Sequence, residues 1–332
     1  MSHFQFDLLR LLQASREELK EMMEVSRELS WKNFGRRIRF YAPGFVSYKS
    51  PFFSSSPRLF PSVSVTGTAC ALKCKHCQGK LLKTMIPAFT PADLVEVCRD
   101  LKDKGCLGLL ISGGCLPDGS VPLSRFIGAM AQVKRDLKLK IVTHTSLIDG
   151  ETARRLKEAG VDAALIDIIG SDETIQEVYQ LNAEVKDYDE SLRALHGAGI
   201  PSVPHVLIGL HYGKIKGEFQ ALEMISKYDP AAVIAIAFTP IRGTVMEDVK
   251  PPTPEDIVKV LIAARLMMPT TPIVLGCMRP KGKHRLEADK LAVRAGVNAI
   301  AFPTEAAINL AESMGLAITF SPLCCSQIFE DL

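Results

Sequence analysis

Long apolar runs are missing from the 332-residue chain. No stretch approaches the ~20 consecutive apolar residues that a membrane-spanning helix needs. The first residues, MSHFQFDLLRLLQ, mix charged with apolar side chains and lack the apolar core of a secretory signal. Neither sign of charge predominates, because the formal net charge is only +3. We therefore expect a cytoplasmic protein with no membrane partner and no nucleic-acid partner.

Two common motifs are absent as well. No G-x-G-x-x-G sequence opens a helix, which argues against an open, dinucleotide-binding sheet. No second C-x₂-C pair follows the first, as a zinc ribbon would require. Nine cysteines are nevertheless present. In a cytoplasmic protein such a number indicates metal or redox chemistry rather than disulfide bonds.

The most informative motif is the run CALKCKHC, in which Cys70, Cys74 and Cys77 have the spacing C-x₃-C-x₂-C. Iron–sulfur clusters are ordinarily held by four cysteines. Three thiolates this close can hold three irons of a four-iron cluster and leave the fourth iron open to a small molecule. A structural zinc site is the alternative, but it needs a fourth ligand, and His76 adjoins Cys77 too closely to chelate easily. The spacing therefore favours an iron–sulfur cluster.

Apolar strands alternate with amphipathic helices through the rest of the chain. Thr90-Pro91 and Thr253-Pro254 each open a helix with proline at its first position. Continuous apolar strands separated by helices indicate a parallel sheet covered by helices. We therefore predict an α/β fold, a TIM-type (β/α)8 or near-complete barrel. The eight expected strands are 62–66, 108–112, 140–145, 162–167, 202–208, 231–238, 273–277 and 297–302.

The chain is expected to divide into three parts. A helical extension, 1–58, contains a capping box formed by Ser15 and Glu18. The barrel covers 59–315, and a cysteine-bearing tail, 316–332, is expected to close over the barrel mouth. Functional side chains of such barrels gather at the carboxyl ends of the strands. Thr145 and Asp167 hold such positions, and Asp167 needs a ligand or a cationic partner because burying an unpaired carboxylate is costly.

The other cysteines divide by position. Cys98 lies on an apolar helix face and Cys106 just precedes a strand, so we interpret both as buried, inert thiols. The remaining four lie at strand ends or in the tail and could hold a second iron–sulfur cluster, with Ser326 or Arg279 as an unusual ligand. They are Cys115, Cys277, Cys324 and Cys325.

The cysteine spacing resembles that of the radical S-adenosylmethionine (SAM) enzymes. The resemblance implies that Cys70, Cys74 and Cys77 hold a [4Fe–4S] cluster whose open iron chelates SAM. An electron then splits SAM into methionine and a 5′-deoxyadenosyl radical, which removes hydrogen from an unreactive C–H bond. It also implies that the backbone at Gly113 and Gly114 approaches the methionine amino group. His76 stands where the family usually has an aromatic residue.

The strand from His205 to Leu210 resembles the family's adenine-contacting G-x-I-x-G-x-x-E strand. Gly209 is retained, whereas His205 and Tyr212 replace the first glycine and the glutamate. On this resemblance His205, Gly209, Thr145 and Asp167 are candidate contacts to SAM or substrate.

Segments 238–244 and 276–280 resemble the biotin synthase-like branch of the family. Together with the second cysteine set, this implies sulfur insertion, and the chain resembles subunits of the archaeal two-protein lipoyl synthase. The expected partners are SAM, an octanoylated carrier protein or peptide, a sister radical SAM subunit and an electron donor such as ferredoxin. The alternatives are another radical SAM reaction (biotin synthase-like, methylation, rearrangement or cofactor maturation) and a non-catalytic iron–sulfur or zinc-binding protein.

Overall fold

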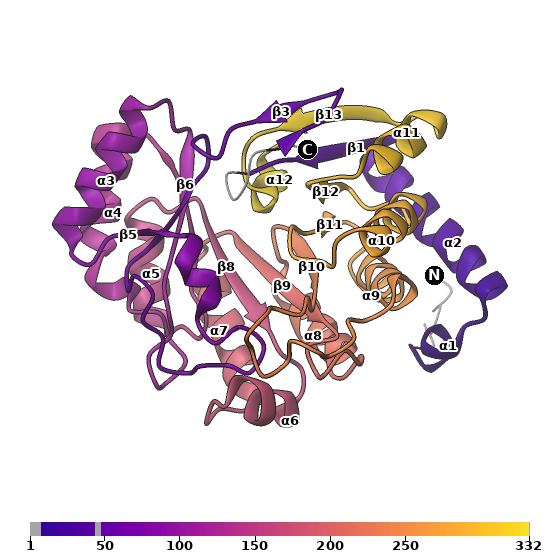
Figure 1. The fold of residues 1–332 in the computed structure, drawn as a ribbon, viewed down its shortest axis with the longest axis horizontal. Helices are drawn as coiled ribbons and strands as arrows, with labels where there is room; N and C mark the ends of the chain where they lie inside the picture. Colours follow the sequence, from indigo (N-terminus) through magenta and orange to yellow (C-terminus); the bar gives the residue numbers. More distant parts are fainter. Residues whose placement is uncertain (1–7, 44–47, 332) are drawn as a thin grey trace.

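One curved, eleven-stranded sheet forms the centre of the computed structural model, which describes residues 8–43 and 48–331 (Figure 1). Residues 1–7, 44–47 and 332, parts of the expected extension and tail, lie outside the described residues. Every strand pair of this sheet is parallel. In spatial order the strands are β13 (Ala317–Ser321), β1 (Arg37–Tyr41), β12 (Ala299–Ala301), β11 (Ile273–Leu275), β10 (Val233–Ala237), β9 (Ser202–Ile208), β8 (Ala163–Ile168), β7 (Lys140–His144), β6 (Gly108–Ser112), β4 (Ser62–Ser64) and β5 (Ile86–Pro87).

The eight strands expected from the sequence are all present, as β4 and β6 to β12. The predicted α/β barrel class is confirmed. Within the described residues the sheet ends at β13 on one side and at β5 on the other, so it curls into an incomplete barrel. A separate antiparallel pair, β2 (Tyr48–Lys49) and β3 (Ser54–Ser55), packs beside β13 through the stacked rings of Phe53 and Phe320.

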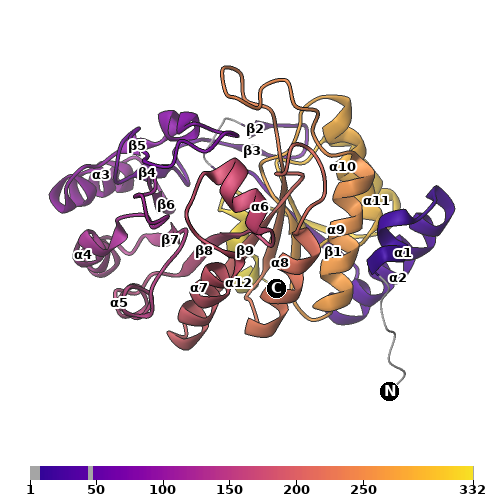
Figure 2. The same cartoon turned by 90° about the horizontal axis from the view of Figure 1, so that it is seen from below.

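Helices cover the outer, convex face of the sheet (Figures 1 and 2). The expected caps are present: Ser15 and Glu18 form a capping box, and Thr90 and Thr253 cap helices with proline in the first turn. Within 8–43 and 48–331, no helix has both the length and the apolar character to cross a bilayer. The helices are α1 (Leu8–Gln13), α2 (Arg16–Phe34), α3 (Pro91–Asp103), α4 (Ile127–Leu137), α5 (Gly150–Glu158), α6 (Asp172–Thr174), α7 (Val185–Gly197), α8 (Glu218–Ile225), α9 (Pro254–Met267), α10 (Lys283–Arg294), α11 (Glu305–Ser313) and α12 (Ile328–Asp331).

The region before residue 58 is only partly helical, which differs from the expected extension. Its strand β1 inserts between β12 and β13 and becomes part of the sheet. Alternating arginines in the sequence RIRFY obscure this strand, because Arg37 is exposed while Ile38 and Phe40 are buried. Helix α2 docks on the barrel as well, since the buried Ser26 hydroxyl donates to the Ala295 carbonyl at 2.8 Å.

The tail lies inside the curved sheet rather than across its mouth, which corrects the expected placement. After β13 the chain turns inward, and Cys324, Cys325 and Ile328 pack with apolar side chains of the concave face. Helix α12 lies inside the curve of the sheet (Figure 1), and its Glu330 pairs with Lys140, the first residue of β7. The tail therefore occupies the barrel interior.

Candidate active site

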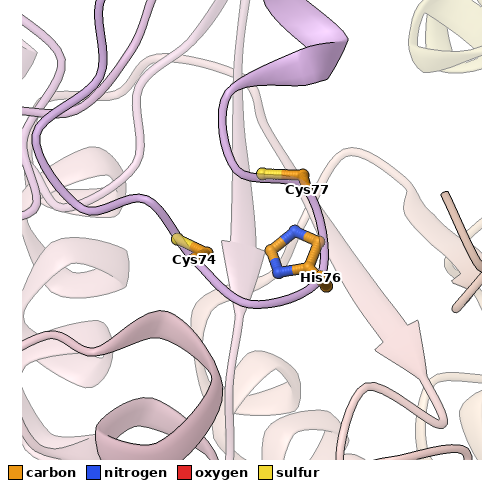
Figure 3. A group of neighbouring side chains, drawn as sticks. All are labelled: Cys74, His76 and Cys77. Carbon is orange, nitrogen blue, oxygen red and sulfur yellow. The ribbon is translucent and has the colours of Figure 1, made fainter. Parts of the chain in front are cut away.

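The three motif cysteines lie on the loop between β4 and the short helix η1 (Lys80–Thr84). Left-handed turns at Lys73 and Gln78 (φ 48° and 47°) fold this loop tightly. One sulfur each from Cys74 and Cys77 and a ring nitrogen of His76 lie within 4.8 Å of one another (Figure 3). The structure thus brings a ring nitrogen of His76 near both sulfurs, although His76 and Cys77 are neighbours in the sequence.

Four thiols at this end of the sheet form two hydrogen-bonded pairs, Cys74 with Cys77 and Cys70 with Cys115. The hydrogen bond with Cys115 lowers the pKa of Cys70 to about 5. The hydrogen bond with Cys74, and a further one with His76, lower the pKa of Cys77 to about 4. The pKa of each partner thiol is raised. Since thiolates are the form that binds metal, this group suits a metal cluster.

Gly113 and Gly114 follow β6 and face the cysteine loop. A Cβ at Gly114 would lie 1.9 Å from the Ala69 carbonyl oxygen and 2.6 Å from the Cβ of Cys70. Only glycine fits so close to another backbone. The Gly114 N–H donates to Thr66 Oγ1 at 2.7 Å. The glycine pair therefore lets β6 and the cysteine loop touch, which is a packing role in addition to the expected contact with SAM.

Three polar side chains meet at the carboxyl ends of β7, β8 and β9: His144, Asp167 and His205. His144 Nε2 lies 3.3 Å from Asp167 Oδ1, and the two imidazole rings are 5.7 Å apart. Burial opposes both charges, but their attraction outweighs it. The pKa of His144 is raised, and the pKa of Asp167 is lowered to about 2. Asp167 has therefore found the cationic partner that its burial required.

His205 differs from His144 in protonation. Burial lowers its pKa to about 4, so its imidazole is neutral at pH 7. Its Nδ1 lies 3.0 Å from the Val203 carbonyl oxygen, which can only accept. The proton is thus on Nδ1, and Nε2 keeps a free lone pair. The three side chains therefore present a carboxylate in contact with one imidazole, beside a second imidazole that is neutral.

Two other candidate site residues, Thr145 and Gly209, also have a role in the local structure. The Thr145 hydroxyl donates to the carbonyls of Ser146 and Leu165, and Thr145 lines a cavity of about 770 Å³ beside α7. Gly209 has φ 73°, and a Cβ there would lie 2.6 Å from Pro252. Tyr212 stands where the family's adenine-contacting strand has glutamate. It accepts a 2.9 Å hydrogen bond from Lys75, which connects the segment after β9 to the cysteine loop.

A second cysteine group lies deeper in the barrel. Cys277 follows β11, and Cys324 and Cys325 come from the tail; all three pack with the concave face. Cys324 and Cys325 share a hydrogen bond, which lowers the pKa of Cys324 to about 7. The pKa of Cys277 is raised to about 11 by burial and by the nearby Cys324. The structure thus brings together three of the four cysteines expected for a second cluster and places Cys115 beside Cys70 instead.

Arg279, one of the two unusual ligands considered for the second cluster, is held by contacts within the protein. Its fully buried guanidinium pairs with Asp289 at 2.7 Å and donates to the carbonyls of Ala301 and Phe302. Together with a bond from Nη1 to the Gly276 carbonyl, these contacts use four of its five N–H groups within the protein. Its partner Asp289 accepts from the Thr304 N–H, and the pair locks the end of β11 to β12. Cys98 and Cys106 are buried, as expected.

Sequence reasoning missed the ion pair of His144 and the place of Cys115. His144 had a signal, since it is a polar residue at the end of an expected strand, directly before Thr145. Cys115 was assigned by its position at a strand end, which does not reveal that Gly114 brings it against Cys70.

Two family models match the chain. The radical SAM superfamily matches residues 64–222, and the biotin and thiamin synthesis associated domain matches residues 236–314. The chain is 24% identical over 291 residues to a biotin synthase of Acetivibrio thermocellus, covering 84% of this chain and 82% of that protein. It is 26% identical over 303 residues to one of Prochlorococcus marinus, with 86% and 81% covered.

Solved structures share the fold. Methylornithine synthase (PylB) superimposes with a TM-score of 0.67 at 19% identity, covering 98% of this chain and 95% of that one. The hydrogenase maturase HydG from Carboxydothermus hydrogenoformans gives a TM-score of 0.66 at 14% identity, covering 94% and 75%. At these identities the likeness concerns the fold alone.

A curved parallel sheet with a three-cysteine loop after its first barrel strand defines the class. The chain belongs to the radical SAM superfamily. Within it the chain is biotin synthase-like, because the second family model and the curated relatives extend the match over most of the sequence. The alternative of a non-catalytic iron–sulfur or zinc-binding protein is therefore set aside, and the chain is a radical SAM enzyme.

Proposed function

We propose that this enzyme inserts sulfur into an octanoyl chain carried by a protein, as one subunit of a two-protein lipoyl synthase. The observation that supports sulfur insertion is the second cysteine group, Cys277, Cys324 and Cys325, inside the barrel. A tail that carries two cysteines into the interior has no role in radical formation alone. An auxiliary iron–sulfur cluster held there would lie on the same side of the sheet as the radical site and could supply sulfide.

The residues present fit the radical cofactors. Cys70, Cys74 and Cys77 would hold the [4Fe–4S] cluster, which with SAM supplies the radical that breaks an unreactive C–H bond. Gly113 and Gly114 keep the end of β6 free of side chains, so that a ligand's amino group can approach the backbone. Lys75 and Tyr212 hold the cysteine loop against β9.

The side chains of His144, Asp167 and His205 form a polar layer at the carboxyl ends of β7, β8 and β9. The charge of Asp167 acts on Cys115, and that of His144 acts on Cys324, so the layer is near both. A substrate between the two cysteine groups would contact this layer. Neutral His205 can accept a hydrogen bond from it, while His144 stays in contact with the carboxylate of Asp167.

The choice of substrate rests on the resemblance to lipoyl synthase subunits, and it brings three proposed partners: the octanoylated carrier protein, a sister radical SAM subunit and a reductant such as ferredoxin. The curated relatives are biotin synthases, so sulfur insertion into a small molecule is the second candidate. The two differ in whether the octanoyl carrier or the sulfur-free biotin precursor acquires sulfur.

The first experiment counts iron and sulfide after anaerobic reconstitution. Two clusters require about eight irons per chain, and about four should remain in either Cys70/Cys74/Cys77→Ala or Cys277/Cys324/Cys325→Ala. The wild type, with its sister subunit, should then give a sulfur-containing octanoyl product. A wild type with about four irons, all lost with Cys70, Cys74 and Cys77, would contradict sulfur insertion and favour another radical SAM reaction.

A further inference from the structure

Cys115 is the fourth thiol at the carboxyl end of the sheet. Its thiol shares a hydrogen bond with Cys70, and its carbonyl accepts a 2.8 Å hydrogen bond from the Ala71 N–H. The adjoining Gly114 N–H is bound by Thr66. Contacts between the loops that follow β4 and β6 thus place Cys115 beside Cys70, one of the three motif cysteines.

Cys115 is unlike the inert thiols of this chain. Cys98 lies on α3 and Cys106 just before β6, and they are only 0% and 2% exposed. Cys115 is partly exposed at the mouth of the barrel. Its other side-chain contact is Ser146 Oγ at 3.7 Å, a long and weak partner for a thiol. Its sulfur is therefore free to exchange its present partner for another.

A four-iron cluster ordinarily takes four thiolates. The motif cysteines supply three, and the fourth iron must be open when SAM binds. A further thiolate in the same group competes for that iron. The two loops that carry these thiols already touch at Gly114 and Cys70.

We propose that Cys115 binds the fourth iron of the radical cluster while SAM is absent, and that SAM displaces it. The inference rests on membership of the radical SAM class and not on the proposed substrate. In the exchange the iron–sulfur bond to Cys115 breaks, and the thiolate keeps the electron pair. The ammonium group of SAM must lose a proton to bind iron, and the released thiolate takes that proton. The exchange is therefore balanced in charge and protons.

The exchange changes how readily the cluster accepts an electron. A cluster with four thiolates is more negative than one in which a SAM molecule of no net charge has replaced a thiolate. Net charge is one of the properties that set the reduction potential of these clusters. Cys115 thus makes the cluster hard to reduce until SAM has bound, which prevents electrons from entering a site that holds no substrate.

The test compares the wild type with Cys115→Ala and, as a matched control, Cys98→Ala, which removes a buried thiol on α3. All are reconstituted anaerobically with iron and sulfide, and SAM binding is measured by equilibrium dialysis. If Cys115 holds the iron in about nine of ten SAM-free molecules, its removal tightens apparent SAM binding about tenfold. The control should bind like the wild type.

A second readout is spectroscopic and independent of activity. Each protein is reduced chemically without SAM, and the electron paramagnetic resonance signal that changes on adding SAM identifies the radical cluster. We expect a weak signal from wild type and control and a strong one from Cys115→Ala. Equal SAM affinity or equal reduction in wild type and Cys115→Ala would overturn the proposal. Loss of iron on replacing Cys115 in a chain without Cys70, Cys74 and Cys77 would also overturn it, by assigning Cys115 to the auxiliary cluster.

Discussion

Asp167 and His144 face each other from neighbouring strands, and their pairing shows how far single residues could be interpreted from sequence. The cost of burying a carboxylate predicted that Asp167 has a ligand or a cationic partner. The structure shows the partner, at 3.3 Å. Sequence could not show whether His144 or His205 pairs with Asp167. The answer depends on the hydrogen bond that His205 Nδ1 forms with the Val203 carbonyl oxygen.

Gly114 gives the first prediction at this scale. Replacing it with alanine puts a methyl group against the Ala69 carbonyl, so the cysteine loop must move. We expect a loss of about 1–3 kcal/mol in the free energy of unfolding and incomplete iron binding. The control is Gly128→Ala on the exposed face of α4, where nothing lies within 4 Å. That change should stabilise the helix by up to about 1 kcal/mol. Full iron content in Gly114→Ala would show that the loops do not touch.

Glu218 gives a prediction about pH. Burial raises the pKa of this carboxyl to about 7 from an ordinary 4.5, against hydrogen bonds from the N–H groups of Gly209 and Lys216. Between these pH values the folded protein holds a proton that the unfolded chain releases, so stability falls as pH rises from about 4.5 through about 7. The loss should reach about 3 kcal/mol at most.

Glu218→Gln cannot titrate and should remove this slope. Urea unfolding of both proteins at pH 5 and pH 7.5 measures it. The introduced amide group faces the backbone N–H donors of Gly209 and Lys216, so the free energies of unfolding of the two proteins should differ by an amount that does not depend on pH. Only a difference in how these free energies change with pH reports the pKa of Glu218. Parallel pH profiles would show that Glu218 ionises normally.

At the scale of elements, periodicity predicted every strand that is apolar along its whole length. Two of the strands that it missed, β1 and β13, are not buried along their whole length. Charged residues alternate with buried ones in β1, and β13 is a partly exposed edge strand. The tail was misplaced for a related reason: a sequence shows that Cys324 and Cys325 are apolar enough to be buried, but not on which side of the sheet. Only the assembled sheet has a concave face for them to fill.

Ile328 tests that placement. Its side chain is fully buried against the concave face. Ile328→Val should lower the free energy of unfolding by about 0.5–1.5 kcal/mol and Ile328→Ala by about 2–5 kcal/mol, because a larger cavity forms. Denaturant unfolding of the graded pair measures this. If both variants were as stable as the wild type, the tail would be a surface segment.

At the scale of the whole molecule, segments far apart in the sequence meet. Strand β1 lies between β12 and β13, and Asp331 in α12 pairs with Arg39 of β1 at 2.6 Å while accepting from Tyr41 at 2.7 Å. The division into an extension, a barrel and a tail follows the sequence pattern, but the sheet joins all three. Long-range pairing of this kind cannot be predicted from local periodicity.

Asp331→Asn tests whether the molecule unfolds as one unit. The single tryptophan, Trp31, lies on α2, 300 residues before Asp331 in the sequence. Losing the charge at Asp331 should lower stability by about 1–2 kcal/mol. If the parts are cooperative, the urea midpoint shifts equally in Trp31 fluorescence and in far-UV circular dichroism. Asp136→Asn, which removes an exposed ion pair with Arg135, should shift neither. A shift in circular dichroism alone would mean that α2 unfolds separately from the sheet, although β1, the strand that follows α2 in the sequence, is part of that sheet.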